Sequence, residues 1–203
     1  MLNVFARASV SRAVDPIGRA LVRAGLTPNG MTLIGTAGAI AASLVFFPTG
    51  MLLAGTFVVW FFAMLDVLDG AMARAKGSPT AFGAVLDATG DRLADGALFG
   101  AIAWWCFMVA DNRTAAAAAL IALVLAQIIS YIKARAEASG LQAEGGWIER
   151  PERLIIALVG TGLQGLGVPH AIEVSLWLLV GLSTVTLVQR MLAARRSAQE
   201  AAR

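Results

Sequence analysis

The chain has 203 residues, of which 58% are hydrophobic and only 14% are charged, and its formal net charge at pH 7 is +3. Soluble domains usually contain about 25% charged residues, so this composition excludes an ordinary soluble fold and indicates a membrane protein. Because a membrane-spanning helix needs about 20 apolar residues, 203 residues supply roughly six spans and leave no room for a separate soluble domain.

The first 24 residues carry basic side chains spread among apolar ones, without the uninterrupted apolar stretch of a signal peptide. We expect this segment to be retained as an amphipathic helix on the inner membrane surface. Its apolar side chains are Val4, Phe5, Val10, Val14, Ile17, Leu21 and Val22. An ordinary solvated arm is the alternative.

The charge-free run from Ala24 to Leu65 has 42 residues and as one helix would be about 63 Å long, twice the thickness of the hydrocarbon core. The run must therefore fold back, and Pro48-Thr49-Gly50 is the predicted turn. Counting apolar residues between polar loops then predicts six spans. They are Asn29–Phe47, Gly50–Leu68, Asp91–Ala110, Thr114–Ile132, Leu154–Leu166 with its flanks, and Ala171–Gln189.

Six spans place both termini on one side of the membrane, together with fifteen of the sixteen basic residues, and only Arg113 falls on the other side. The positive-inside rule makes that side cytoplasmic. The sequence thus predicts an all-α integral membrane protein of the cell membrane, with six transmembrane helices preceded by a cytoplasmic-surface amphipathic helix. It forms one membrane domain over 1–203, with the surface helix at 1–24, the bundle at 25–195 and a cytoplasmic tail at 196–203.

Five aspartates lie at the ends or within the second and third spans, where charge is costly and therefore indicates function. They are Asp66, Asp69, Asp87, Asp91 and Asp95. Their spacing of three or four residues puts each set on one face of its helix, and a short loop would bring the two faces together at the cytoplasmic surface. So many carboxylates repel one another unless cations lie among them. Neutralisation by Arg74 and Arg92 is the alternative.

Magnesium or manganese suits such oxygen ligands, whereas the single histidine and the single cysteine, His170 and Cys106, are not placed to favour zinc. The stretch from Asp66 to Asp91 reads D-x-x-D-G-x-x-A-R, then eight residues, then G-x-x-x-D-x-x-x-D. This pattern, with eight fixed positions over 26 residues, resembles the signature of the CDP-alcohol phosphotransferase family. Those membrane enzymes attach an alcohol to the phosphoryl group of a CDP-activated partner and release CMP.

The resemblance implies a role for each motif residue. The ligands of two Mg²⁺ or Mn²⁺ ions would be Asp66, Asp69, Asp87 and Asp91, and Asp91 would also take the proton of the attacking hydroxyl. The CDP-diacylglycerol site would comprise Asn29, Gly30, Met31, Thr32, Gly70, Arg74 and Thr80, with Arg74 on the pyrophosphate. Without the resemblance, residues 27–32 indicate only a helix start with Asn29 as its N-cap. Asp95 lies outside the signature. It would either contact the metal ligands without binding the metal itself or form an ion pair with Arg92.

Cations at the cytoplasmic ends of the later spans indicate an anionic acceptor, although they could also be anchors of the positive-inside kind. These regions, and nearly the whole chain, resemble the actinobacterial phosphatidylinositol phosphate synthase branch of the family. That branch transfers the phosphatidyl group of CDP-diacylglycerol to inositol phosphate. By this resemblance the acceptor phosphate would be bound by Ser130, Lys133, Arg153 and Arg190.

The expected reaction is one in-line displacement at the lipid-side phosphorus, with metal assistance and release of CMP. Glycerol 3-phosphate as the acceptor is an alternative within the same chemistry. A carboxylate-relay transporter and a non-catalytic assembly protein are alternatives of other classes. We expect a homodimer, for which Gly96-Ala97-Leu98-Phe99-Gly100 could pack, and no nucleic-acid partner.

Overall fold

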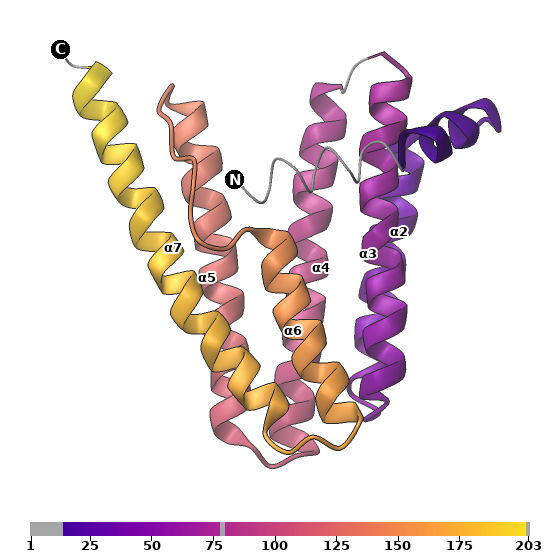
Figure 1. Ribbon diagram of the computed structural model, residues 1–203, viewed down its shortest axis with the longest axis vertical. Coiled ribbons are helices and arrows are strands. Elements are labelled where there is room, and N and C mark those ends of the chain that lie inside the picture. Colours follow the sequence, from indigo (N-terminus) through magenta and orange to yellow (C-terminus); the bar gives the residue numbers. More distant parts are fainter. Residues whose placement is uncertain (1–13, 78–79, 202–203) are drawn as a thin grey trace. The chain divides into compact units, whose positions relative to one another are not determined.

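The structure is a computed structural model, and it describes residues 14–77 and 80–201. The regular structure of these residues is entirely helical. A helical stretch at residues 14–23 precedes six longer helices (Figure 1). These are α2 (Pro28–Phe46), α3 (Leu52–Ala75), α4 (Ala81–Met108), α5 (Arg113–Ala138), α6 (Arg150–Gly165) and α7 (Ala171–Ala201). Of the expected surface helix, Val4, Phe5 and Val10 lie outside the described residues.

Each predicted span corresponds to a helix, and the bounds differ most for the third and the sixth. α4 begins at Ala81 rather than near Asp91, and α7 continues to Ala201 rather than ending near Gln189. Counting apolar residues identifies only the apolar part of a helix, which is the part that can be surrounded by lipid. The added end of α7 is rich in alanine and arginine, and the added start of α4 contains three alanines, and these residues favour a helix in water as well as in lipid. The expected tail is thus helical over residues 196–201.

Four helices are long and apolar enough to cross a bilayer, namely α2, α3, α5 and α7. α6 has 16 residues and is therefore only about 24 Å long. α4 has 28 residues, but it carries Asp87, Asp91, Arg92 and Asp95. The set of apolar helices makes this a membrane protein, all-helical in the part that the structure describes, and α4 differs from the four apolar helices in carrying these charges along its length.

The turn between α2 and α3 lies where the sequence predicts it. The amide of Gly50 donates to the carbonyl oxygen of Phe47 at 2.9 Å, and the amide of Met51 donates to that of Phe46 at 3.0 Å. Gly50 has a φ of +77°, a conformation that glycine adopts without the strain of a side chain. The turn ends α2 and reverses the chain.

The start of α2 differs from the prediction. The side-chain oxygen of Thr27 accepts a hydrogen bond from the amide of Gly30 at 3.1 Å, which is the geometry of an N-cap. Pro28 follows at the first helical position, where its missing amide proton costs nothing. The prediction that Asn29 is the N-cap was therefore wrong, and Asn29 lies inside the first turn with its side chain available for another role.

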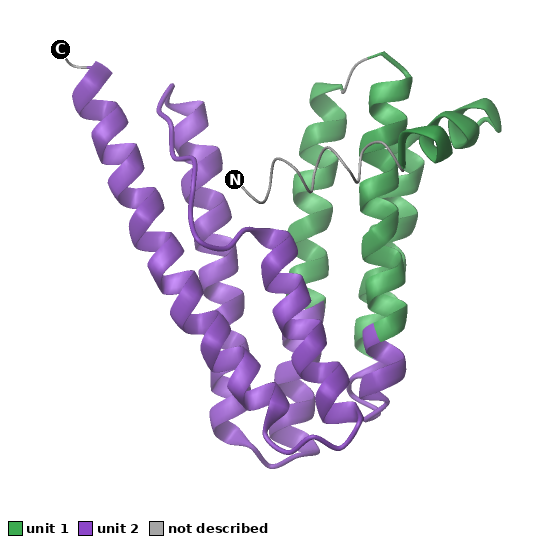
Figure 2. Cartoon of the chain, in the orientation of Figure 1, with its two compact units in different colours: residues 1–44, 57–97 green, residues 45–56, 98–203 purple. Residues whose placement is uncertain are grey.

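The chain divides into two compact units (Figure 2). Unit 1 comprises residues 1–44 and 57–97, and unit 2 comprises residues 45–56 and 98–203. In unit 1, the stretch 14–23 packs closely on α3, since a Cβ on Gly18 would lie 2.9 Å from the backbone of Ala71. In unit 2, α7 packs against both α5 and α6. All of the predicted metal and CDP-diacylglycerol residues belong to unit 1, and all of the predicted acceptor residues belong to unit 2.

Candidate active site

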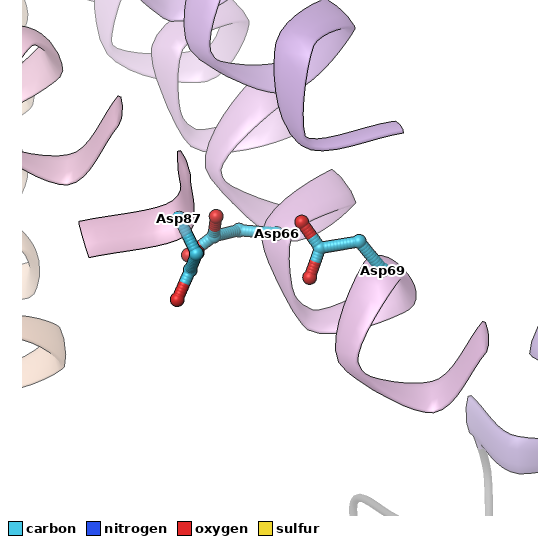
Figure 3. A group of neighbouring side chains, drawn as sticks. All are labelled: Asp66, Asp69 and Asp87. Carbon is cyan, nitrogen blue, oxygen red and sulfur yellow. The ribbon is translucent and has the colours of Figure 1, made fainter. Parts of the chain in front are cut away.

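Three of the predicted metal ligands come together in unit 1. Asp66 and Asp69 lie one turn apart on α3 and meet Asp87 of α4 (Figure 3). One carboxylate oxygen from each lies within 4.8 Å of the other two. Three oxygen donors this close fit a hard divalent cation such as Mg²⁺ or Mn²⁺, which also relieves the repulsion among the carboxylates. Asp91, one turn further along α4, is not part of this cluster.

Asp91 and Asp95 are associated with Arg92. The Nη2 atom of Arg92 lies 3.8 Å from Oδ2 of Asp91 and 3.7 Å from Oδ2 of Asp95. Asp95 is buried, so an uncompensated charge there would be costly. Of the two interpretations of Asp95, the structure supports the one in which it is a partner of Arg92.

Asp69 is held from α2. The hydroxyl of Thr32 donates to Oδ2 of Asp69 at 2.5 Å, and both residues are buried. The sequence placed Thr32 among the residues that bind the CDP-lipid and did not predict this contact. The two residues are 37 positions apart, and no pattern of residue spacing in the sequence predicts that they are in contact.

A cavity of about 840 Å³ opens beside the carboxylates. It is bounded by the start of α2, the end of α3 and the start of α4. Its lining residues are Thr27, Pro28, Asn29, Thr32, Asp69, Gly70, Ala73, Arg74, Lys76, Thr80, Gly83, Ala84 and Asp87. The volume is within the range of ligand sites for small molecules. The cavity thus combines a candidate cation site, the basic side chains of Arg74 and Lys76, and several glycines and alanines.

Five of the seven residues predicted to bind the CDP-lipid line this cavity, and Gly30 and Met31 do not. Asn29 and Thr32 are three residues apart and share a face of α2, whereas Met31 points into the protein and is buried. Lys76 is a lining residue that sequence reasoning missed as part of the site. From the sequence, Lys76 was identified only as one of the basic residues on the predicted cytoplasmic side.

Two of the lining residues also have structural partners. Arg74 donates from Nη2 to Oδ1 of Asp15 at 2.9 Å. Thr80 accepts at its side-chain oxygen from the amide of Gly83 at 3.0 Å, and so caps α4. A Cβ on Gly83 would lie 3.1 Å from the side-chain oxygen of Asn29, so α2 and α4 approach closely at the cavity wall.

The predicted acceptor residues come from three helices of unit 2. Ser130 donates to the carbonyl oxygen of Ala126 within α5 at 3.0 Å, and Nζ of Lys133 lies 3.8 Å from the carboxylate of Glu137. Arg153 of α6 and Arg190 of α7 are both buried.

Arg190 uses two of its donors on backbone carbonyls. Nε donates to Gly145 at 3.1 Å, and Nη1 donates to Ile129 at 3.0 Å. Ile129 directly precedes Ser130, so Arg190 reaches the stretch of α5 that holds a second predicted acceptor residue. Its role in fixing α7 to α5 and to the loop after α5 was not predicted from the sequence.

Residues 25–189 match the CDP-alcohol phosphatidyltransferase family. The chain belongs to this family. The match covers all six long helices except the end of α7, and it includes the whole carboxylate cluster and the cavity. The resemblance inferred from the Asp66–Asp91 signature is therefore confirmed.

The chain is also similar to a phosphatidylinositol phosphate synthase of Mycobacterium tuberculosis, with 52% identity over 193 residues, which are 94% of this chain and 89% of the relative. Two crystal structures from the same organism have the same fold. One, with CDP-DAG bound, has 52% identity and a TM-score of 0.85 over 90% of this chain and 94% of that one. The other, in complex with manganese and citrate, has 52% identity and a TM-score of 0.86, and the match covers 91% of this chain and 90% of that one.

Proposed function

We propose that this protein transfers the phosphatidyl group of CDP-diacylglycerol to inositol phosphate, giving phosphatidylinositol phosphate and CMP. The observation that carries the proposal is the meeting of Asp66, Asp69 and Asp87 beside a cavity of about 840 Å³. This site lies in a chain 52% identical, over 94% of its length, to a phosphatidylinositol phosphate synthase.

The CDP-lipid would be bound by Asn29, Gly30, Met31, Thr32, Gly70, Arg74 and Thr80, of which the five that line the cavity would contact it directly. The absence of a side chain at Gly70 lets the nucleotide approach the backbone of α3. Arg74 supplies a planar set of donors for the pyrophosphate oxygens, and Lys76 adds a second positive charge at the same wall.

The cation ligands would be Asp66, Asp69 and Asp87, with Asp91 as the fourth by likeness to the family. When bound, Mg²⁺ or Mn²⁺ ions, two in this proposal, neutralise pyrophosphate charge and polarise the phosphoryl group. The aspartates contribute by fixing oxygen ligands at the edge of the cavity. Their spacing on two helices keeps that arrangement rigid.

Asp91 would act as the general base. Its carboxylate takes the proton of an inositol hydroxyl, whose oxygen then attacks the lipid-side phosphorus while CMP leaves. Arg92 lies 3.8 Å from that carboxylate. The acceptor phosphate would be held by Ser130, Lys133, Arg153 and Arg190, whose cations neutralise it.

We further propose that all six long helices cross the cell membrane as one domain over 1–203, with both termini and the site on the cytoplasmic side. Fifteen of the sixteen basic residues then lie on that side. Residues 1–24 would form the surface helix, of which Ile17 is exposed. The bundle would extend over 25–195 and the tail over 196–203. A homodimer that packs at Gly96 and Gly100 is part of the same proposal.

An acceptor screen tests the function. Purified protein with CDP-diacylglycerol and Mg²⁺ or Mn²⁺ is given inositol phosphate, inositol, glycerol 3-phosphate or serine, and CMP release is measured. We expect release with inositol phosphate, its loss on adding EDTA, and its return with excess metal. Faster release with glycerol 3-phosphate would assign the alternative acceptor, and no CMP release with any acceptor would contradict the proposed chemistry.

A further inference from the structure

The hydroxyl of Thr32 on α2 donates to Oδ2 of Asp69, a member of the carboxylate cluster, at 2.5 Å. An ionised carboxylate can only accept, so Thr32 is the donor. The two side chains are 6% and 7% exposed. Water therefore competes little for this hydrogen bond, which makes it stronger and more directional than a surface contact.

The proton of Thr32 has two acceptors within reach. The hydroxyl oxygen lies 3.1 Å from the carbonyl oxygen of Pro28, which is the ordinary contact of a threonine with its own helix. The contact with Asp69 is shorter and has a charged acceptor, and hydrogen bonds to charged groups are roughly twice as strong as neutral ones. A hydroxyl has one proton, so the contact with Asp69 leaves none to donate to a nucleotide.

We propose that Thr32 is a positioning residue for the metal site: its hydroxyl holds one oxygen of Asp69 so that the other is directed toward the cation. Groups that hydrogen-bond to ligating carboxylates fix the ligand's orientation and strengthen cation binding. The inference rests on the proposed function for the presence of a divalent cation at Asp66, Asp69 and Asp87. It adds a role toward the cation site to the proposed place of Thr32 in the CDP-lipid site.

The contact comes from a helix that supplies no carboxylate to the site. Asp66 and Asp69 lie on α3 and Asp87 lies on α4, whereas α2 carries no charged residue. Thr32 is branched at Cβ, so its rotamer in the helix is restricted. One short contact thus fixes the site to a third helix, whose first turn also lines the cavity.

The test measures Mn²⁺ binding to the full-length protein in detergent, from the electron paramagnetic resonance signal of free Mn²⁺. Thr32→Val removes the hydroxyl and keeps the shape, Thr32→Ala removes it without any risk of overpacking, and Thr32→Ser keeps it. We expect Val and Ala to weaken Mn²⁺ binding about 10-fold or more, the usual effect of losing such a partner. Thr32→Ser should stay within about threefold of the wild type, well short of that loss.

Thr184→Val is the matched control. Its hydroxyl donates only to Val180 of its own helix at 2.8 Å in the structure, so Mn²⁺ binding should not change. If Thr32→Val does not fold, the Mn²⁺ affinities of Thr32→Ala and Thr32→Ser are compared instead, because these two variants also differ in the hydroxyl. Wild-type Mn²⁺ affinity in the variants without the hydroxyl would overturn the inference.

Kinetics separate the inference from the proposed function. The Mn²⁺ concentration that half-saturates CMP release should rise about 10-fold or more in Thr32→Ala and should stay within about threefold of the wild type in Thr32→Ser. A raised KM for the CDP-lipid with unchanged Mn²⁺ binding would mean a direct nucleotide contact and would also overturn the inference. Failure of the wild-type protein to release CMP would contradict the proposed function while leaving the Mn²⁺ result valid.

Discussion

Arg74 donates a hydrogen bond from Nη2 to Oδ1 of Asp15 at 2.9 Å, which joins the end of α3 to the helical stretch at residues 14–23. On its other side, Nη1 of Arg74 lies 3.6 Å from where a Cβ on Gly70 would be. One edge of the guanidinium is thus anchored by Asp15, and the other lies over the glycine of the signature at the cavity wall. The stretch that precedes α2 therefore contacts the proposed pyrophosphate site.

Arg74→Gln should raise the KM for CDP-diacylglycerol at least 10-fold, because charge-assisted hydrogen bonds to the pyrophosphate contribute about 1.5–3 kcal/mol. Asp15→Asn should raise it by no more than about fivefold, since both partners are partly exposed and such pairs contribute about 0–1 kcal/mol. Initial rates of CMP release against CDP-lipid concentration measure both. Arg23→Gln, an exposed residue of the same stretch, is the control. A larger effect of Asp15→Asn than of Arg74→Gln would contradict this order.

Gly70→Ala should impair substrate binding without harming the fold. A Cβ at this position meets nothing closer than Nη1 of Arg74 at 3.6 Å, an ordinary contact, and alanine favours a helix over glycine by about 1 kcal/mol. The methyl group would project beside the cavity, so the KM for CDP-diacylglycerol should rise several-fold while the thermal unfolding midpoint stays equal or increases.

Gly181→Ala is the control for that substitution, because a Cβ there meets nothing within 4 Å and the residue lies on α7 in unit 2. The KM for CDP-diacylglycerol should stay as in the wild type, and the thermal unfolding midpoint should stay equal or increase. A lower unfolding midpoint in Gly70→Ala would show that the glycine serves packing rather than the ligand.

The parts of the site that could be predicted from the sequence are those encoded by spacing within one helix. Asp66 and Asp69 share a face because they are three residues apart, and the helical period alone establishes this. The turn at Gly50 and the order of the six helices follow from apolar run lengths in the same way. The signature then joined α3 to α4 by its likeness to a family.

Contacts between distant positions could not be predicted in this way. Thr32 meets Asp69, Asp15 meets Arg74, and Arg190 reaches the carbonyl oxygen of Ile129 only because separate helices pack. None of these pairs has a local pattern. The N-cap was misassigned for a different reason, since Asn29 is as good a cap as Thr27 by residue type and only Pro28 between them decides where the helix begins.

Asp91→Asn should reduce CMP release at least 100-fold, because an amide cannot accept the proton of the attacking hydroxyl and general-base catalysis contributes about 10²–10⁴. The protein should still insert and purify, since the two side chains have the same shape. Asp111→Asn is the control, because its φ of +47° suits asparagine equally well and it lies in the loop before α5. Turnover near the wild-type rate would remove Asp91 from the role of base.

Arg153→Gln should raise the KM for inositol phosphate by 10-fold or more and that for CDP-diacylglycerol by less than threefold. The reason is that a contact with the acceptor phosphate is lost selectively. Arg153 is buried, so Arg153→Lys serves as a second variant that keeps the charge. Arg195→Gln, an exposed cation of α7, is the control. Equal increases in both constants would count against the acceptor pocket.

Arg190→Lys separates the structural role of this residue from its proposed role on the acceptor phosphate. The lysine keeps the charge but cannot reproduce the two hydrogen bonds to the carbonyl oxygens of Gly145 and Ile129, at 3.1 and 3.0 Å. Ile129 is buried, and a buried carbonyl left without its charged donor costs about 1–3 kcal/mol. The thermal unfolding midpoint should therefore fall, and the loop at residues 140–149 should be cleaved faster in limited proteolysis.

The comparison with Arg190→Gln completes this test. Both substitutions remove the contacts of the guanidinium with the backbone, so the two variants should lose similar stability, but only the glutamine also removes the charge. If the positive charge binds phosphate, the KM for inositol phosphate should rise further in Arg190→Gln than in Arg190→Lys. Arg196→Lys, exposed on the same helix, controls for the change of residue type. Equal KM values in the two Arg190 variants, with equal losses of stability, would make this residue a purely structural link of α7 to α5.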